Sequence, residues 1–280
     1  MSFIAACVQS TATPDIQHDI RVLTDFIREA AAKGARFIAT PEYCAGLDTR
    51  DGKMFPVAFA ESEHPVLPAM QGLAKELKLW LLVGSIGVRA PDGKIFNRSF
   101  MLSPAGAIAA RYDKIHLFDI DLGEGRSYRE SATIEAGKAA VIAPCAEGMI
   151  GLSICYDIRF PHLYRAYAQA GAELIAAPAA FTRVTGAAHW HVLQRARAIE
   201  NGAYVISPGQ CGTLAGGADC YGHSLIVDPW GRVLADGGTE AGVITAEIDL
   251  ALVKETRRRI PSLAHDRAFA PACLDTAKAS

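Results

Sequence analysis

The residue with the clearest chemical potential in this chain is Cys155. It follows an apolar run from Met149 to Ile154, and polar residues and the helix-opening Pro161 come soon after it. The pattern predicts a sharp turn from a strand into a helix, where a thiol can face a cleft and the Tyr156 amide can point at a developing oxyanion. Most single cysteines are buried structural residues, so a catalytic interpretation of Cys155 requires partner side chains.

Two further strand ends supply such partners. A thiol ionises only slightly at neutral pH, so a nucleophilic cysteine needs a base and a cation beside it. Glu42 lies just past the carboxyl end of the expected strand 36–40, and Lys114 lies in the equivalent position after the expected strand 106–112. Functional groups of open α/β sheets gather at the carboxyl ends of strands, so the three side chains are predicted to meet in one cleft.

The elements that would position these side chains alternate along the chain. Turn-forming pairs such as Asp92-Gly93 indicate hairpins, so the sheets should be mixed rather than purely parallel. Apolar residues at helical spacing predict helices over 14–33, 65–78, 161–171 and 187–201. The expected strands are 3–9, 36–40, 80–88, 95–103, 106–112, 139–144, 148–154, 173–177, 203–208, 222–227, 232–236 and 242–248.

Length and composition indicate one globular unit. Half of the 280 residues are hydrophobic and 21% are charged, which is typical of a globular protein with a large core. No repeat, low-complexity tract or linker divides the chain. We therefore expect a single α/β domain over residues 1–250, followed by a C-terminal arm over 251–280.

Several classes of function are excluded by the same data. A net charge of −2 and a pI near 6.4 give no electrostatic basis for binding nucleic acid. No apolar run reaches the roughly 18 residues that a membrane span requires. The first nine residues carry no basic leader and are expected to form a core strand, which predicts a cytoplasmic protein. The seven cysteines are scattered without a Cys-x-x-Cys pair, which argues against a disulfide framework.

His189 and His191 are the nearest approach to a metal-binding pair. Residues two apart on a helix point about 200° away from each other, so the two imidazoles should diverge. No third ligand lies in register with them in the sequence. We therefore expect neither a metal nor another cofactor.

Three motifs together resemble the Glu-Lys-Cys triad of the carbon-nitrogen hydrolase (nitrilase) superfamily in order and spacing. They are Thr40-Pro41-Glu42, Tyr112-Asp113-Lys114-Ile115-His116-Leu117-Phe118 and Ser153-Ile154-Cys155-Tyr156-Asp157-Ile158-Arg159-Phe160-Pro161. The resemblance extends over residues 3–268 and includes Tyr221-Gly222-His223-Ser224 and Asp228-Pro229-Trp230-Gly231. It is strongest to the branch that holds the ω-amidases and the amidases of deaminated glutathione.

This resemblance implies a fold and an assembly. The fold would be a four-layer α-β-β-α sandwich with mixed sheets. C-terminal arms in this superfamily commonly reach across a dimer interface. A homodimer or higher homo-oligomer, with the layers α-β-β-α-α-β-β-α, is therefore expected.

The resemblance also implies hydrolysis of a linear carboxamide through a thioester, with a small carboxylate-bearing molecule as substrate and acid plus ammonia or amine as products. Cys155 would attack the carbonyl carbon and Glu42 would move the protons. Lys114 and the Tyr156 amide would stabilise the oxyanion, and Glu130 matches a second pocket glutamate that supports the lysine and positions substrate. Hydrolysis of N-carbamoyl amino acids or of nitriles stays open, as does a binding protein without turnover.

Residues after the expected strand 173–177 should line the cleft opposite Cys155 and bind substrate, namely Phe181, Thr182, Arg183 and Thr185. The Arg183 guanidinium would either hold a substrate carboxylate or lie on the surface.

Two loops, 44–64 and 116–130, are expected to set the choice of substrate. Asp157 and Arg159, next to the nucleophile, are expected to form an internal ion pair that holds the turn.

Overall fold

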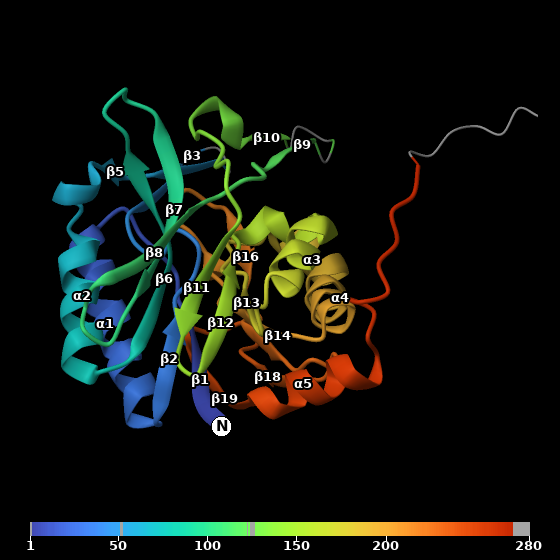
Figure 1. Ribbon diagram of the computed structural model, residues 1–280. Helices are drawn as coiled ribbons and strands as arrows, with labels where there is room; N and C mark the ends of the chain where they lie inside the picture. Colours follow the sequence, from blue (N-terminus) through green and yellow to red (C-terminus); the bar gives the residue numbers. More distant parts are fainter. Residues whose placement is uncertain (1, 51–52, 122, 124–126, 271–280) are drawn as a thin grey trace, which may run out of the picture.

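Two mixed β-sheets form the centre of the computed structural model, which describes residues 2–50, 53–121, 123 and 127–270 (Figure 1). The first sheet has the strand order β19-β1-β2-β6-β7-β8, with β5 paired to β6. Parallel pairing joins β1, β2 and β6, and antiparallel pairing adds β19, β7 and β8. The strands are β1 (Ser2–Gln9), β2 (Ala35–Ala39), β5 (Ala58–Phe59), β6 (Trp80–Arg89), β7 (Ile95–Leu102), β8 (Ile108–Asp113) and β19 (Gly242–Asp249).

The second sheet has the order β11-β12-β13-β14-β17-β18. Its central strands β12, β13 and β14 are parallel, and its outer strands are antiparallel. The strands are β11 (Val141–Cys145), β12 (Gly148–Leu152), β13 (Leu174–Ala176), β14 (Tyr204–Ser207), β17 (Leu225–Val227) and β18 (Val233–Asp236). Both sheets are therefore mixed, as the turn signals predicted.

Helices cover the outer faces of the two sheets. Helices α1 (Ile16–Ala32) and α2 (Val66–Leu77) pack on the first sheet, and α3 (Pro161–Gln169) and α4 (Arg183–Asn201) pack on the second. Figure 1 shows the two helix pairs on opposite sides of the molecule, with the sheets between them. One buried cluster joins the facing sides of the two sheets with α3 and α4, and a second joins the first sheet with α1 and α2.

Helix α1 shows how the sequence specifies these elements locally. The Asp15 side chain accepts hydrogen bonds from the amides of Gln17 and His18, which satisfies free donors of the first turn. Leu23 and Ile27 then repeat at helical spacing and are buried against the first sheet. The helix therefore begins and ends within two residues of the predicted range.

Each predicted helix and strand has a counterpart, and the largest boundary error lies at α4, which begins at Arg183 instead of residue 187. Three hairpins were not predicted because they are short and lack an alternating apolar pattern. They are β3 (Leu47–Arg50) with β4 (Lys53–Pro56), β9 (Asp119–Asp121) with β10 (Ser127–Arg129), and β15 (Cys211–Thr213) with β16 (Asp219–Tyr221).

The expected C-terminal arm begins with a helix, α5 (Leu250–Arg259). Leu250 and Val253 of this helix pack into the core of the same chain. Residues 271–280 of the arm lie outside the described part. Among the described helices, none combines the length and the apolar character needed to cross a membrane.

Gly84 in β6 lies against the backbone of the segment that carries Glu42. A Cβ atom at Gly84 would lie 1.9 Å from the Thr40 carbonyl oxygen and 2.4 Å from that of Pro41. The Gly84 amide also donates to Thr40 Oγ1 at 3.0 Å. Glycine at this position therefore permits the close approach that fixes the end of β2.

We expect Gly84→Ala to lower the free energy of unfolding by about 1–3 kcal/mol, because a clash with backbone atoms cannot be relieved by a side-chain rotation. Gly72→Ala is the matched control. A Cβ there meets nothing within 4 Å in the exposed middle of α2, so alanine should raise stability by about 0.5–1 kcal/mol. Urea unfolding followed by circular dichroism measures both variants, and similar effects of the two substitutions would contradict this account.

Candidate active site

Cys155 lies on a strained turn between strand and helix. Strand β12 ends at Leu152, and a short 3-10 helix over Cys155–Arg159 follows before α3 begins. Cys155 has a φ of +48°, which is unusual for a residue other than glycine, and its amide donates to the Pro178 carbonyl at 2.8 Å. A strained backbone conformation of this kind persists only where contacts with the surrounding structure hold it in place, and such conformations are common at functional sites. The turn predicted from the sequence is present.

Glu42 lies just beyond the end of β2 and is 2% exposed. Its Oε1 accepts hydrogen bonds from Asn97 Nδ2 and Lys114 Nζ, both at 2.9 Å. Its Oε2 accepts from the Ala180 amide at 2.8 Å. These donors stabilise an ionised carboxylate in a place from which water is largely excluded.

Lys114 lies between two carboxylates. Its Nζ is 2.9 Å from Glu42 Oε1 and 2.8 Å from Glu130 Oε2, and its side chain is 2% exposed. Burial alone would lower the pKa of Lys114, but the charges of Glu130, Glu42 and Cys155 raise it well above the usual value. The side chain is therefore an ammonium ion that is fixed in position.

Glu130 holds that ammonium from the other side. Its Oε2 also accepts from the Phe118 amide at 2.7 Å, and its Oε1 accepts from Tyr43 Oη at 3.2 Å. The Glu130 carboxylate thus links the loop around residue 118 to the end of β2.

The Cys155 thiol is protonated in this environment. Burial raises the pKa of Cys155 well above the usual range, and the charge of Glu42 raises it further, while Lys114 lowers it. A thiol in this state is a weak nucleophile until a base removes its proton. Glu42, whose carboxylate lines the same cavity as the thiol, is placed to do so.

Asp157 stabilises the turn from behind. Its carboxylate is fully buried and accepts hydrogen bonds from Tyr112 Oη at 2.7 Å, the Ile154 amide at 2.8 Å and the His116 amide at 3.0 Å. The carboxylate points into the core, toward donors of β8 and of the segment that follows it.

The expected ion pair between Asp157 and Arg159 is wrong. The Arg159 guanidinium instead lies over the rings of Phe181 and Tyr156, and its Nη2 is 3.3 Å from His189 Nδ1. The two side chains leave the 3-10 helix in different directions, so they cannot meet.

A cavity of about 410 Å³ opens onto Cys155, Glu42 and Lys114, a size suited to a small molecule. Both loops expected to set specificity line it. Its lining among the described residues is Glu42, Tyr43, Lys53, Met54, Phe55, Lys114, Phe118, Ser127, Tyr128, Arg129, Glu130, Ala132, Thr133, Cys155, Ala180, Phe181, Thr182 and Thr185.

The residues expected to bind substrate divide into two groups. Phe181, Thr182 and Thr185 line the cavity. Arg183 does not, because it occupies the exposed first turn of α4, with a side chain 58% exposed and Nε 3.8 Å from Asp219 Oδ2. This placement corresponds to the surface alternative for Arg183.

Two residues that support the site, Asn97 and Gln210, were not singled out from the sequence. Asn97 is fully buried in β7 and reaches both Glu42 and Glu130. Gln210 Nε2 donates to the carbonyls of Glu42 at 3.0 Å and Tyr43 at 2.9 Å. The sequence could have indicated Asn97, because it is a polar residue on the buried face of an expected strand. It contains no such indication for Gln210, which follows a strand far away in the sequence.

The fold and this site define a class of enzyme. Residues 4–258 match the family model of the carbon-nitrogen hydrolases, and the chain belongs to that family. It is a hydrolase of carbon-nitrogen bonds other than peptide bonds and has the nitrilase-superfamily fold. The resemblance seen in the motifs is confirmed.

The chain is also similar to individual proteins of this family. A deaminated glutathione amidase of Synechocystis sp. is 39% identical over 268 residues, which cover 94% of this chain and 97% of the relative. The human omega-amidase NIT2 is 36% identical over 260 residues and 93% of each chain. The crystal structure of Saccharomyces cerevisiae Nit3, a member of branch 10 of the nitrilase superfamily, superposes with a TM-score of 0.83 at 29% identity, over 93% of this chain and 94% of that one.

We expect Glu42→Gln to make the thiol more acidic and the enzyme less active. Removing the carboxylate charge lowers the pKa of Cys155, since Lys114 remains. Loss of a general base should reduce turnover by about 10²–10⁴-fold. The pH dependence of Cys155 alkylation by iodoacetamide, followed by peptide mass spectrometry, should move to lower pH.

Cys155→Ser identifies the labelled peptide in that experiment, and Glu135→Gln, which removes a partly exposed carboxylate paired with Lys94, serves as the matched charge control. An alkylation profile that moves to higher pH in Glu42→Gln, or turnover equal to wild type, would exclude Glu42 as the base.

Proposed function

We propose that the chain hydrolyses the linear carboxamide of a small carboxylate-bearing substrate, either deaminated glutathione or the ω-amide of a keto acid. The observation that carries this proposal is one cavity of small-molecule size that holds the Cys155 thiol, the buried carboxylate of Glu42 and the ammonium ion of Lys114 fixed beside that carboxylate. The names of the two relatives support the substrate class.

The proposed reaction begins when Glu42 takes the proton from the Cys155 thiol and the sulfur forms a bond to the carbonyl carbon. The negative charge on the carbonyl oxygen is then stabilised by the Lys114 ammonium and by the Tyr156 amide. Tyr156 lies in the first turn of its 3-10 helix, where amides have no acceptor within the helix.

The tetrahedral intermediate collapses to a thioester when the carbon-nitrogen bond breaks and Glu42 returns the proton to the leaving nitrogen. The product of this half is ammonia from a keto-acid ω-amide and an amine from deaminated glutathione. Glu42 then takes a proton from water, the hydroxide adds to the thioester, and the sulfur leaves with that proton. Glu130 and Asn97 position Lys114 and Glu42 throughout.

Two further cations line the cavity and are proposed to bind the carboxylate of the substrate. Lys53 comes from the β3–β4 hairpin and Arg129 from the end of β10. Charge-assisted hydrogen bonds from such groups are among the stronger polar contacts in proteins. Both lie on the loops expected to set specificity, so they replace Arg183 in this role.

Hydrolysis of N-carbamoyl amino acids is the main alternative, because such substrates carry both a carboxylate and a carbonyl bonded to nitrogen. Nitrile hydrolysis uses the same attacking thiol. Both reactions begin with attack of the thiol on the substrate carbon, so N-carbamoyl amino acids and nitriles are tested together with the amides.

We expect wild type, and not Cys155→Ser, to turn over keto-acid ω-amides or deaminated glutathione. The acid product is followed by mass spectrometry, because the nitrogen product differs between substrates. Lys53→Ala and Arg129→Ala should raise KM by about 10–100-fold, the value of a charged hydrogen bond, with a smaller change in kcat. Arg183→Ala should leave KM unchanged.

Three outcomes would count against this proposal. Activity retained by Cys155→Ser would exclude the nucleophile. Turnover restricted to N-carbamoyl amino acids or nitriles would exclude the amide substrate. A raised KM only in Arg183→Ala would return carboxylate binding to Arg183.

We further propose that the chain is a four-layer α-β-β-α sandwich that forms a homodimer through α4. Val184, Val192 and Ile199 recur at intervals of eight and seven on this helix and are 57%, 67% and 53% exposed. Trp230 and Ile260 lie beside Ile199 in one surface cavity and are half exposed as well. Contiguous exposed apolar side chains mark interaction surfaces. Residues 261–264, which follow α5, line the same cavity.

Light scattering after size exclusion should give a mass twice the 29.8 kDa of one chain for wild type and 29.8 kDa for Val192→Asp. Phe59→Asp, which places the same charge at an exposed apolar residue outside α4, should stay dimeric. A monomeric wild type, or a dimeric Val192→Asp, would refute the assembly.

A cytoplasmic location is also proposed. The six described cysteines are all free and buried, which suits a reducing compartment. Detection of the protein in a secreted or periplasmic fraction would contradict it.

A further inference from the structure

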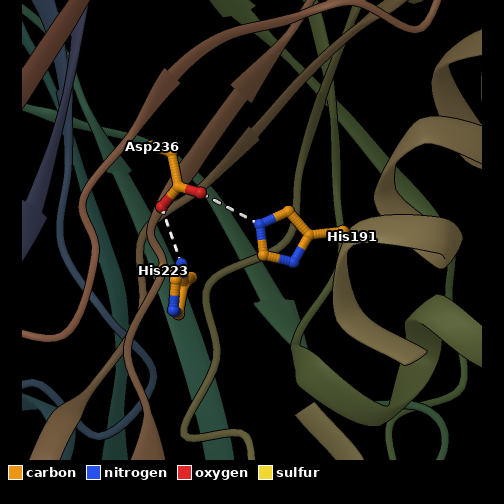
Figure 2. A group of neighbouring side chains, drawn as sticks. All are labelled: His191, His223 and Asp236. Carbon is orange, nitrogen blue, oxygen red and sulfur yellow. Dashed lines mark hydrogen bonds and ion pairs between the residues drawn. The ribbon is translucent and has the colours of Figure 1, made fainter. Parts of the chain in front are cut away.

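Three potential metal ligands from distant parts of the sequence meet on the side of the second sheet. His191 projects from α4, His223 lies between β16 and β17, and Asp236 ends β18 (Figure 2). His191 Nε2 is 3.0 Å from Asp236 Oδ2, and His223 Nδ1 is 2.9 Å from Asp236 Oδ1. The three ligand atoms lie within 4.8 Å of one another.

These distances suit coordination by one ion. Ligand atoms that bind zinc tetrahedrally at about 2.0–2.2 Å lie about 3.3–3.5 Å apart. Small rotations of the two imidazoles would therefore place all three ligand atoms around a single metal ion. The ion would take the place of the two hydrogen bonds between the imidazoles and the carboxylate. The three side chains are 34%, 24% and 35% exposed, so water can complete the shell.

The backbone that presents His223 is held firmly. His223 has a φ of +51°, which is uncommon for a residue other than glycine. Its amide donates to the Gly238 carbonyl at 2.6 Å, and its carbonyl accepts from Trp190 Nε1 at 2.7 Å. A strained conformation fixed by two hydrogen bonds positions the imidazole toward Asp236.

Asp236 is prepared to act as an anionic ligand. His191 Nε2 and His223 Nδ1 each lie within hydrogen-bond distance of a different one of its carboxylate oxygens. The Gly238 amide donates to Oδ1 at 2.9 Å, which leaves lone pairs on both carboxylate oxygens.

His189, the other histidine of α4, is not part of this cluster. Its Nδ1 lies 3.3 Å from Arg159, so the two α4 histidines diverge as their spacing predicted. The additional ligands are His223 and Asp236, which lie 32 and 45 positions after His191 in the chain. A local sequence pattern cannot show that residues so far apart come together.

We propose that His191, His223 and Asp236 form a binding site for one divalent transition metal ion, with zinc the best match to two imidazoles and a carboxylate. The ion would join α4 to the β16–β17 connection and to β18. Trp190, adjacent to His191, packs on Phe181 of the cavity wall with ring centroids 4.9 Å apart. The site is therefore structural and supports the wall from its outer side, independent of the reaction at Cys155.

Zinc titration by calorimetry tests this proposal in a Cys155→Ser/Cys273→Ser background, which removes the catalytic thiol and the one cysteine outside the described residues. We expect one zinc ion per chain and a melting temperature that rises with zinc concentration. His191→Gln and Asp236→Asn should each weaken zinc binding by about 100-fold or more, since loss of even an outer-shell partner commonly costs 10–100-fold.

His189→Gln is the matched control, because it makes the same substitution two residues away on the same helix and should leave the affinity unchanged. Circular dichroism verifies that each variant is folded. Cobalt provides a second readout, since its visible absorption bands should appear in the double-serine background and disappear in Asp236→Asn.

The proposal would be overturned if His191→Gln and Asp236→Asn bound zinc as tightly as their background. It would also be overturned if His189→Gln abolished binding, or if zinc bound only between two chains, seen as an increase in mass on light scattering.

Discussion

The rest of this site depends on the ion pairs that the Lys114 ammonium group forms with two carboxylates. The ammonium group is buried between Glu42 and Glu130 and donates to both carboxylates, at 2.9 and 2.8 Å. Taking a charge out of water is costly, so such a cluster is stable only when nearly every donor and acceptor is satisfied. Asn97, Tyr43 and the amides of Phe118 and Ala180 supply those contacts.

The charged side chains are kept in place by contacts to the backbone segments that carry them, and not by side-chain packing alone. Gly84 allows β6 to approach the end of β2, and Gln210 binds the carbonyls of Glu42 and Tyr43. On the other sheet, Asp157 ties the Cys155 turn to β8. Glu42, Lys114 and Cys155 are thus each anchored by a contact that crosses from one part of the fold to another.

The second sheet and the elements packed on it carry two groups of chemically reactive side chains. Strand β12 delivers Cys155 to the cavity, whereas α4, β18 and the β16–β17 connection bring His191, Asp236 and His223 together away from it. The ring of Trp190, next to His191, packs at a tilt of 52° on the ring of Phe181, which lines the cavity. A rigid wall matters for catalysis because reacting groups must be held within a fraction of an ångström.

The sequence by itself determined the elements and the three central residues. Strand and helix periodicity depends on neighbours a few positions apart, and Glu42, Lys114 and Cys155 each follow a strand whose pattern is local. Only the tertiary structure decided which other side chains reach them. Asn97 and Gln210 join the site through pairings of distant strands, Arg183 leaves it because α4 begins early, and Asp157 points away from Arg159. The His191, His223 and Asp236 cluster is also invisible in the sequence, because its ligands come from three elements whose proximity depends on how the second sheet and α4 pack.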